Sequence, residues 1–357
     1  MDTTRRAAPD APVALTMGDA AGIGPEIIAE VFRRRPEWSA RCVVIGDLAV
    51  MRRAVQVTGG ALPIAVLDGP QQARDVPPRC IPLWPAVSLA ALPPFGAVSA
   101  AAGRAAADAV ILAAEAALRG EVAALVTAPL NKAALAAAGL DVPGHTELLQ
   151  AVAARHLGCA PAQLPVRMML SNDELRTVLV SIHVSLREAI EAVTAERVWE
   201  TLRITHTHFT ERLGWPRCRI AVAGLNPHAG EGGLFGREEI DAIAPAVERA
   251  RAAGWCVSGP HPPDTVFMRA RAGAFDVVIA MYHDQGLIPV KYLGLDRGVN
   301  TTLGLPFVRT SPDHGTAFDL AGQGRADPGS LIAALEAALS ACGSAAARTG
   351  SAPTPAG

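Results

Sequence analysis

The sequence predicts an α/β fold built on a mainly parallel sheet. Short apolar runs typical of buried strands recur along the chain, and longer segments with helical periodicity separate them. A chain of 357 residues, half of them hydrophobic, can bury enough apolar surface for two domains or for one elaborate domain.

The apolar runs and the helical patterns alternate along most of the chain. The predicted strands are residues 13–17, 41–46, 122–127, 166–171, 176–182, 218–224 and 276–282. The predicted helices are residues 24–35, 103–119, 186–213 and 237–253. Pro25 suits a first helical turn, and Gly254 suits a helix end. The proline-rich stretch 60–95 fits either a connection between domains or irregular edge structure.

Composition and charge exclude several classes of protein. The net charge of −2 leaves no basic stripe of the kind that nucleic-acid binding requires. No apolar run reaches the roughly 20 residues of a membrane span or resembles a signal peptide. Six cysteines lie far apart without a C-x-x-C pair, which indicates reduced thiols and a cytoplasmic location.

Three histidines follow directly on predicted strands. "TVLVSI" runs into His183, "RIAVAGLNP" into His228 and "DVVIAMY" into His283. Residues just beyond the carboxyl ends of parallel strands converge in space, and three imidazoles with an open position are typical of a catalytic metal site. Taken singly, each histidine also fits an ordinary polar loop residue. The coincidence of three favours a metal site.

Two further histidines and the lysines suggest a binding site for a small polar ligand. His145 and His314 each stand in a glycine-bearing turn beside hydroxyl residues. Of 32 basic side chains only Lys132 and Lys291 are lysines, and the other 30 are arginines. An ammonium is not interchangeable with a guanidinium, so Lys291, eight residues beyond His283, is a candidate site residue. The alternative is that codon bias in the genome favours arginine throughout, and that these two lysines remain by chance.

The glycine-rich stretches do not match the dinucleotide-binding fingerprint G-x-G-x-x-G. In "GEGGLFG" the third glycine position falls on Phe235, and in "GDAAGIGPE" it falls on Ile27. Any nucleotide is therefore expected to bind through another loop arrangement.

Several motifs together resemble one enzyme family. They are "TMGDAAGIGPEI", "TAPLNK", "PGHTELL", "GLNPHAGEGGLFGREE", "PPDTVF", "MYHDQGLIPVK" and "GVNTTLGLPFVRTSPDHGTAFDLAG". They are similar to the 4-hydroxythreonine-4-phosphate dehydrogenases of pyridoxal phosphate biosynthesis, and the resemblance covers residues 12–335. One departure is Ala20, where the family pattern "GDPAGIGPE" has proline; it leaves the chemistry of this loop intact but makes the loop slightly less rigid.

The resemblance implies a two-domain fold like that of isocitrate and isopropylmalate dehydrogenases, with an active-site cleft between the domains of a homodimer. It implies a discontinuous nucleotide-side domain over residues 1–125 and 300–340, and a metal, substrate and dimerisation domain over 126–299. Residues 341–357 offer little to bury and are expected to be disordered.

The resemblance also assigns residue roles. A divalent ion (zinc, magnesium or cobalt) is held by His183, His228 and His283, with ligands drawn from both subunits. NAD or NADP contacts His314 and Gly315, because "DHGTAFDLAG" is similar to a nucleotide-binding loop of the isocitrate-type enzymes. The residues expected to bind the substrate are His145, Thr146, Lys291, Asn300 and Arg309. Lys291 is also the candidate general base, since its pKa is readily shifted.

The implied reaction oxidises the C3 hydroxyl of 4-phosphohydroxythreonine and then releases carbon dioxide to leave 3-amino-2-oxopropyl phosphate. Close relatives oxidise D-threonate or D-erythronate 4-phosphate, and "GHTELL" is also found in those sugar-acid enzymes. Others act on a dihydrodiol dicarboxylate, but "NTTLGLPFVRTS" fits a phosphorylated substrate better. A non-catalytic metabolite-binding protein on the same scaffold is the alternative from another class.

Overall fold

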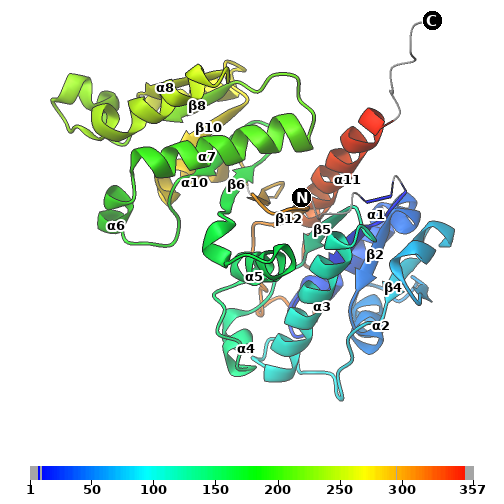
Figure 1. The fold of residues 1–357 in the computed structure, drawn as a ribbon. Coiled ribbons are helices and arrows are strands. Elements are labelled where there is room, and N and C mark those ends of the chain that lie inside the picture. The colour runs from blue at the N-terminus through cyan, green and yellow to red at the C-terminus, as the bar shows by residue number, and fades with distance from the viewer. Residues whose placement is uncertain (1–6, 9, 295, 350–357) are drawn as a thin grey trace, which may run out of the picture. The chain divides into compact units, whose positions relative to one another are not determined.

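The computed structural model describes residues 7–8, 10–294 and 296–349, with residues 344–349 described by their backbone alone. Its contacts divide the chain into two compact units (Figure 1). Unit 1 comprises the described residues up to Pro165 and Leu305–Cys342, and unit 2 comprises the described residues of 166–304 and those from Gly343 onward. The predicted boundaries lay near residues 125 and 300. Residues 126–165 belong to unit 1 because their helices pack against a helix of that unit.

Within the described residues of unit 1, six strands form a wholly parallel sheet in the order β3-β4-β2-β1-β5-β12. The strands are β1 Val13–Thr16, β2 Cys42–Ile45, β3 Ile64–Val66, β4 Ile81–Trp84, β5 Ala124–Thr127 and β12 Val308–Pro312. Strands β3 and β4 lie at one edge of this sheet and come from the proline-rich stretch. That stretch is therefore edge structure, which was one of its two interpretations.

Capping residues define where several helices of unit 1 begin. These helices are α1 Gly24–Arg34, α2 Leu48–Val57, α3 Ala100–Leu118, α4 Lys132–Ala137, α5 His145–Leu157 and the part of α11 Gly329–Thr349 up to Cys342, with short 3₁₀ turns η1 Pro36–Ala40, η2 Pro70–Asp75 and η3 Pro161–Gln163. Asp47 caps α2 by accepting the Val50 N–H at 2.9 Å, and Ser99 caps α3. Helices α3 and α4 approach so closely that a Cβ at Gly103 would lie 2.1 Å from the Ala134 carbonyl oxygen.

The predicted disordered tail is partly wrong. Helix α11 continues to Thr349, so residues 341–349 are helical, and residues 350–357 lie outside the described residues. The alanines of this segment are strong helix formers, and Leu339 and Ala341 are buried.

Within the described residues of unit 2, six strands form a mixed sheet in the order β11-β6-β7-β10-β8-β9. The strands are β6 Arg167–Ser171, β7 Arg176–Leu179, β8 Ile220–Ala223, β9 Val257–His261, β10 Val277–Ala280 and β11 Val299–Leu303. Strands β7, β10, β8 and β9 run parallel, and β6 pairs antiparallel with both β11 and β7. The α/β class and the mainly parallel sheet are confirmed.

Helices cover both faces of the unit 2 sheet (Figure 1). They are α6 Leu186–Glu191, α7 Ala195–Thr207, α8 Ala244–Ala252, α9 Pro263–Arg271 and α10 His283–Tyr292, with the shorter turns η4 His208–Arg212, η5 Pro227–Gly233 and η6 Glu239–Ile243. Along β10, Val277 and Ile279 pack on the α7 and α8 side, and Val278 and Ala280 pack on the α9 and α10 side. This alternation follows from the two-residue period of a strand.

The prediction of a single helix over 186–213 is wrong, because the helical structure is interrupted after residue 191. Helix α6 ends at Glu191, and Thr194 caps a new helix α7 by accepting the Arg197 N–H at 3.2 Å. A threonine hydroxyl at this position starts a helix more favourably than it continues one. No helix of the described residues is both long and apolar enough to cross a membrane.

Candidate functional site

His283 lies where β10 meets α10. It is the first residue of α10, three residues beyond the end of β10, as expected for a residue at a strand tip. Its Nδ1 is 2.7 Å from the Asp284 carboxylate, so its Nε2 is the nitrogen left to meet a ligand. A carboxylate on one ring nitrogen is the usual arrangement behind a metal-bound imidazole, because it fixes the tautomer and the ring orientation. Asp284 belongs to the quoted "MYHDQGLIPVK" motif but was not among the predicted site residues.

His183 follows β7 on an exposed turn. The segment that joins β7 to His183 runs beside the end of β10. The Val180 N–H donates to the Ala280 carbonyl at 2.9 Å, and the Ser181 hydroxyl donates to the Met281 carbonyl at 2.9 Å. The φ angle of His183 is +34°, a backbone conformation that L-residues rarely adopt. Such positions concentrate at functional sites, where they cost about 1–3 kcal/mol each.

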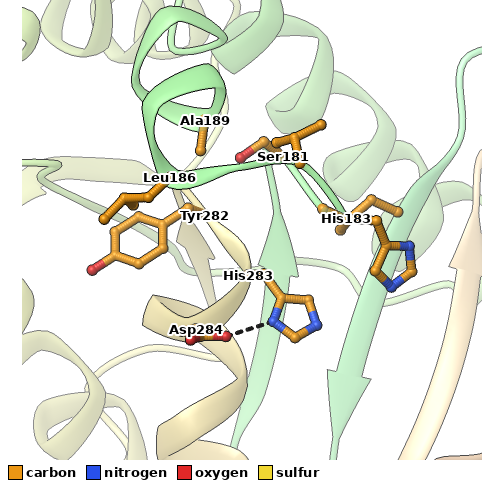
Figure 2. A pocket seen from close by; sticks show the side chains of 9 residues that line it. Ser181, His183, Leu186, Ala189, Tyr282, His283 and Asp284 are labelled. Atoms are coloured by element: carbon orange, nitrogen blue, oxygen red, sulfur yellow. Dashed lines mark hydrogen bonds and ion pairs between the residues drawn. The ribbon is translucent and has the colours of Figure 1, made fainter.

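The structure brings His183 and His283 together. Their ring centres lie 5.7 Å apart, and both line a cavity of about 260 Å³ (Figure 2). Two imidazoles that share one zinc ion through bonds of about 2.1 Å have ring centres roughly 5–6 Å apart. The pair therefore fits two ligands of one divalent ion.

His228 lies outside the lining of this cavity. It is exposed, in the turn η5 after β8, and its nearest described ring is Phe235 with centres 6.1 Å apart. Residues 228–232 all have positive φ, from 44° to 79°. Among the described residues no three His, Cys, Asp or Glu side chains stand in a metal-binding arrangement, so the three-ligand set remains a prediction of which the structure assembles two members.

Two side chains, Gln285 and Glu239, hold the loops that carry these histidines, and the sequence did not reveal their contacts. Gln285 accepts the Met281 N–H at 2.7 Å and donates to the Gly224 carbonyl at 2.8 Å, joining the ends of β10 and β8. Glu239, 3% exposed, accepts the N–H groups of Leu225 and Asn226, each at 2.7 Å. The loop before His228 is thereby tied to the same end of the sheet as His283.

Lys291 and Asn300 lie elsewhere in unit 2. Lys291 is in the last turn of α10, about 12 Å along the helix axis from His283 at 1.5 Å per residue, and it is not part of the cavity lining. Asn300 is a half-buried residue of β11, paired with Leu170 of β6.

In unit 1, Arg309 is a buried cation. It lies on β12, is 3% exposed, and donates from Nη2 to the Thr127 hydroxyl at the end of β5 over 2.7 Å. Burial lowers the pKa of its guanidinium to about 10, and the charge of Glu147 partly counteracts this effect. Arg309 is still positively charged near neutral pH.

His145 lies beside Arg309, at the first position of α5. Burial, and secondly the charge of Arg309, hold the pKa of His145 well below its ordinary 6.5, so its imidazole is neutral near pH 7. A hydrogen bond with the Ala128 backbone raises the pKa of His145. A bond that favours the protonated imidazole is one in which the ring N–H donates, so the ring is the donor. The Nε2 atom is buried and has no hydrogen-bond partner among the described residues. Nδ1 is therefore the donor, and Nε2 is left to accept.

These groups form a site suited to an anion with hydroxyl groups. The start of α5 carries His145, Thr146 and Glu147, and the amino terminus of a helix attracts negative charge. The guanidinium of Arg309 can hold a carboxylate or a phosphate, and the neutral His145 adds no second positive charge. Thr127 and Glu147, both in quoted motifs, were not among the predicted binding residues.

The predicted nucleotide contacts His314 and Gly315 are exposed residues of the loop after β12. His314 Nδ1 lies 3.1 Å from the Gly315 carbonyl oxygen. A Cβ built on Gly315 would meet no atom within 4 Å. The nucleotide role of these two residues stays a prediction.

Comparison with known proteins identifies the family. The model of the pyridoxal phosphate biosynthetic protein PdxA matches residues 38–338. A 4-hydroxythreonine-4-phosphate dehydrogenase of Beijerinckia indica is 52% identical over 92% of this chain and 94% of that protein. A D-threonate 4-phosphate dehydrogenase of Salmonella typhimurium is 45% identical over 92% of this chain and 98% of that protein.

The fold agrees with that assignment. The crystal structure of 4-hydroxythreonine-4-phosphate dehydrogenase from Klebsiella pneumoniae matches 93% of this chain and 98% of its own, at 43% identity and a TM-score of 0.84. The sequence motifs, the fold and the matched family model agree, and the chain belongs to the PdxA family of pyridoxal phosphate biosynthetic proteins.

Proposed function

We propose that this protein is an NAD-dependent, metal-assisted 4-hydroxythreonine-4-phosphate dehydrogenase. It oxidises 4-phosphohydroxythreonine at C3, and decarboxylation then gives 3-amino-2-oxopropyl phosphate, a step in pyridoxal phosphate biosynthesis. One observation carries the proposal: a chain of this family holds a buried guanidinium beside a neutral imidazole whose Nε2 has no partner among the described residues. That combination suits a substrate with both an anionic group and hydroxyl groups.

The substrate contacts in unit 1 follow from this chemistry. Arg309 binds a phosphate or carboxylate oxygen, and the hydroxyl of Thr146 adds an orienting hydrogen bond. His145 accepts a hydrogen bond from a substrate hydroxyl at Nε2, because its Nδ1 is already committed as a donor to Ala128. Burial of Arg309 strengthens its contact with the anion, because the surroundings screen the charges less than water does.

The residues that would hold a divalent ion are His183, His228 and His283, and zinc, magnesium and cobalt are the candidate ions. When bound, the ion supplies positive charge that stabilises negative charge on the substrate oxygen during oxidation. Asp284 keeps the Nε2 of His283 directed at the site. Lys291 and Asn300 contribute a cation and an orienting amide, and Nζ of Lys291 is the candidate proton acceptor.

NAD or NADP takes up the hydride, and we propose that it contacts the loop at His314 and Gly315. The exposure of this loop and the open space at Gly315 support the assignment.

The alternative is a D-threonate or D-erythronate 4-phosphate dehydrogenase, which the similar Salmonella protein favours. Purified protein loaded with one metal should be assayed for NADH formation with 4-phosphohydroxythreonine and with D-threonate 4-phosphate. We expect kcat/KM to be at least about tenfold higher for the first, about 1.4 kcal/mol of transition-state discrimination. A higher kcat/KM for D-threonate 4-phosphate would indicate a sugar-acid phosphate dehydrogenase instead. No NADH with either substrate would favour a metabolite-binding protein.

We also propose a cytoplasmic homodimer with a shared active site. The six cysteines are free thiols, which suits a reducing compartment. Large apolar side chains are exposed on α10, with Ile288 62% and Tyr292 90% exposed, and Leu234 is 73% exposed after η5. Exposed apolar residues of this kind suit a subunit interface. Sedimentation equilibrium should give twice the chain mass of 36.9 kDa, and a concentration-independent monomer would contradict the dimer.

A further inference from the structure

Glu26 contacts a distant loop from the first turn of α1. Its side chain is buried, with 1% exposure. One carboxylate oxygen accepts the Gly322 N–H, and the other accepts the Gly324 N–H at 3.0 Å. Each oxygen thus takes one backbone donor of a loop nearly 300 residues further along the chain, within unit 1. Hydrogen bonds to an ionised acceptor are roughly twice as strong as neutral ones.

The residues just before α1 hold the same loop at a second point. The Ile23 N–H donates to the Thr316 carbonyl at 3.0 Å. Gly22 packs so closely on Thr316 that a Cβ on Gly22 would lie 2.9 Å from the Thr316 carbonyl oxygen. The loop is therefore fixed at Thr316 and again at Gly322 and Gly324.

Arg53 of α2 contacts the segments that pack against the 313–324 loop. Its guanidinium donates to the carbonyls of Ala20 and Pro93, each at 2.6 Å, and lies 4.0 Å from the centre of the Phe95 ring. Phe95 in turn packs against Gly322, where a Cβ would lie 2.5 Å from the ring. Burial lowers the pKa of Arg53, and the charge of Glu26 counteracts this effect.

The loop needs such support because its backbone is irregular. Ala317, Gly322 and Gly324 have φ angles of +40°, +82° and +61°. A non-glycine residue at positive φ is unfavourable on its own and persists only where its surroundings fix it. His314 and Gly315, the predicted nucleotide contacts, directly precede the first anchor at Thr316.

We propose that Glu26, with Arg53 behind it, is a positioning residue that fixes the loop 313–324 in the conformation that binds the nicotinamide nucleotide. This inference rests on the proposed assignment of NAD to His314 and Gly315. Glu26 does not touch the nucleotide in this scheme; it acts through the backbone of Gly322 and Gly324.

The test variant is Glu26→Gln. A glutamine has nearly the same size, but it has only one oxygen acceptor, and its NH2 group would face a backbone donor. We expect the dissociation constant for NAD, measured by calorimetry, and the KM for NAD each to rise at least about tenfold, which corresponds to about 1.4 kcal/mol. The kcat and the KM for the phosphorylated substrate should change less than about twofold. Amide hydrogen exchange in residues 316–324 should become at least about tenfold faster.

Glu30→Gln is the matched control. Glu30 lies one turn further along α1 and is also buried, at 5% exposure, but it pairs with Arg33 at 2.7 Å and Arg34 at 3.6 Å instead of the loop. The Glu30→Gln variant should leave NAD binding and the amide hydrogen exchange of residues 316–324 unchanged. If Glu26→Gln does not fold, Arg53→Met is the second variant: it removes both donors and the guanidinium over Phe95, and it should raise the NAD dissociation constant at least about threefold.

A third variant separates this inference from the proposed function. Gly315→Trp fills open space, so it should weaken NAD binding at least about tenfold without changing loop exchange. If Gly315→Trp weakens NAD binding and Glu26→Gln does not, the positioning role is overturned and the nucleotide site survives. If neither variant affects NAD binding, the nucleotide assignment itself fails, and the inference fails with it. Unchanged loop exchange in Glu26→Gln would also overturn it.

Discussion

Replacing His183, His228 or His283 singly by alanine is expected to remove most of the bound divalent metal and at least about a hundredfold of the activity, with folding retained. Loss of one of three imidazole ligands leaves two, which do not define a catalytic metal site. Folding should survive because His183 and His228 are exposed and the His283 side chain is 40% exposed.

The measurement is metal content by mass spectrometry after equilibration with zinc, cobalt or magnesium, beside circular dichroism and kcat/KM. His156→Ala is the matched control, since His156 is an exposed histidine in the last turn of α5 with no predicted role. It should bind as much metal as the parent. If all three site variants also retained full metal content, the metal site would have to be abandoned.

Lys291→Arg is expected to lower kcat/KM by at least about tenfold, or roughly 1.4 kcal/mol of transition-state stabilisation. The chain uses arginine for 30 of its 32 basic residues, so a generic positive charge does not require lysine. A compact ammonium contacts an anion from a small volume and can exchange a proton, whereas the guanidinium is broader and stays protonated at working pH.

Metal content and thermal stability of the Lys291→Arg variant should match the parent, because Lys291 lies at the far end of α10 from His283 and outside the cavity lining. A variant with normal turnover would reduce Lys291 to an ordinary positive charge and remove the significance of lysine scarcity. Normal kcat with a raised KM for the phosphorylated substrate would assign Lys291 to binding alone.

Local patterns in the sequence were sufficient for much of the fold. All seven predicted strands are present, because continuous apolar runs such as Val277–Ala280 have to be buried on both faces of a sheet. The positions of His183 and His283 after strands followed from the same patterns, and the structure places their rings near each other. These features depend on residues close together in the chain, so one sequence is enough to predict them.

Strands β3, β4, β9, β11 and β12 were not predicted. Strand β4 contains Pro82, β9 contains Gly259 and Pro260, and β11 and β12 are rich in threonine and other polar residues. Proline and glycine weaken the strand pattern of β4 and β9, and the polar residues of β11 and β12 break the continuous apolar run by which a buried strand is recognised. They are strands because a neighbouring strand pairs with their backbone, as β5 does with β12.

The site shows the same division between local and distant information. The sequence by itself determined which residue types are available: the three histidines after strands, the two lysines and the glycine-bearing loops. Only the tertiary structure decided that Arg309 is buried beside His145, that Gln285 joins the ends of β10 and β8, and that Glu26 meets Gly322 and Gly324. Burial, pKa shifts and hydrogen bonds of this kind depend on which distant segments pack together. That packing is set by the free energy of the whole fold, and no local pattern in the chain encodes it.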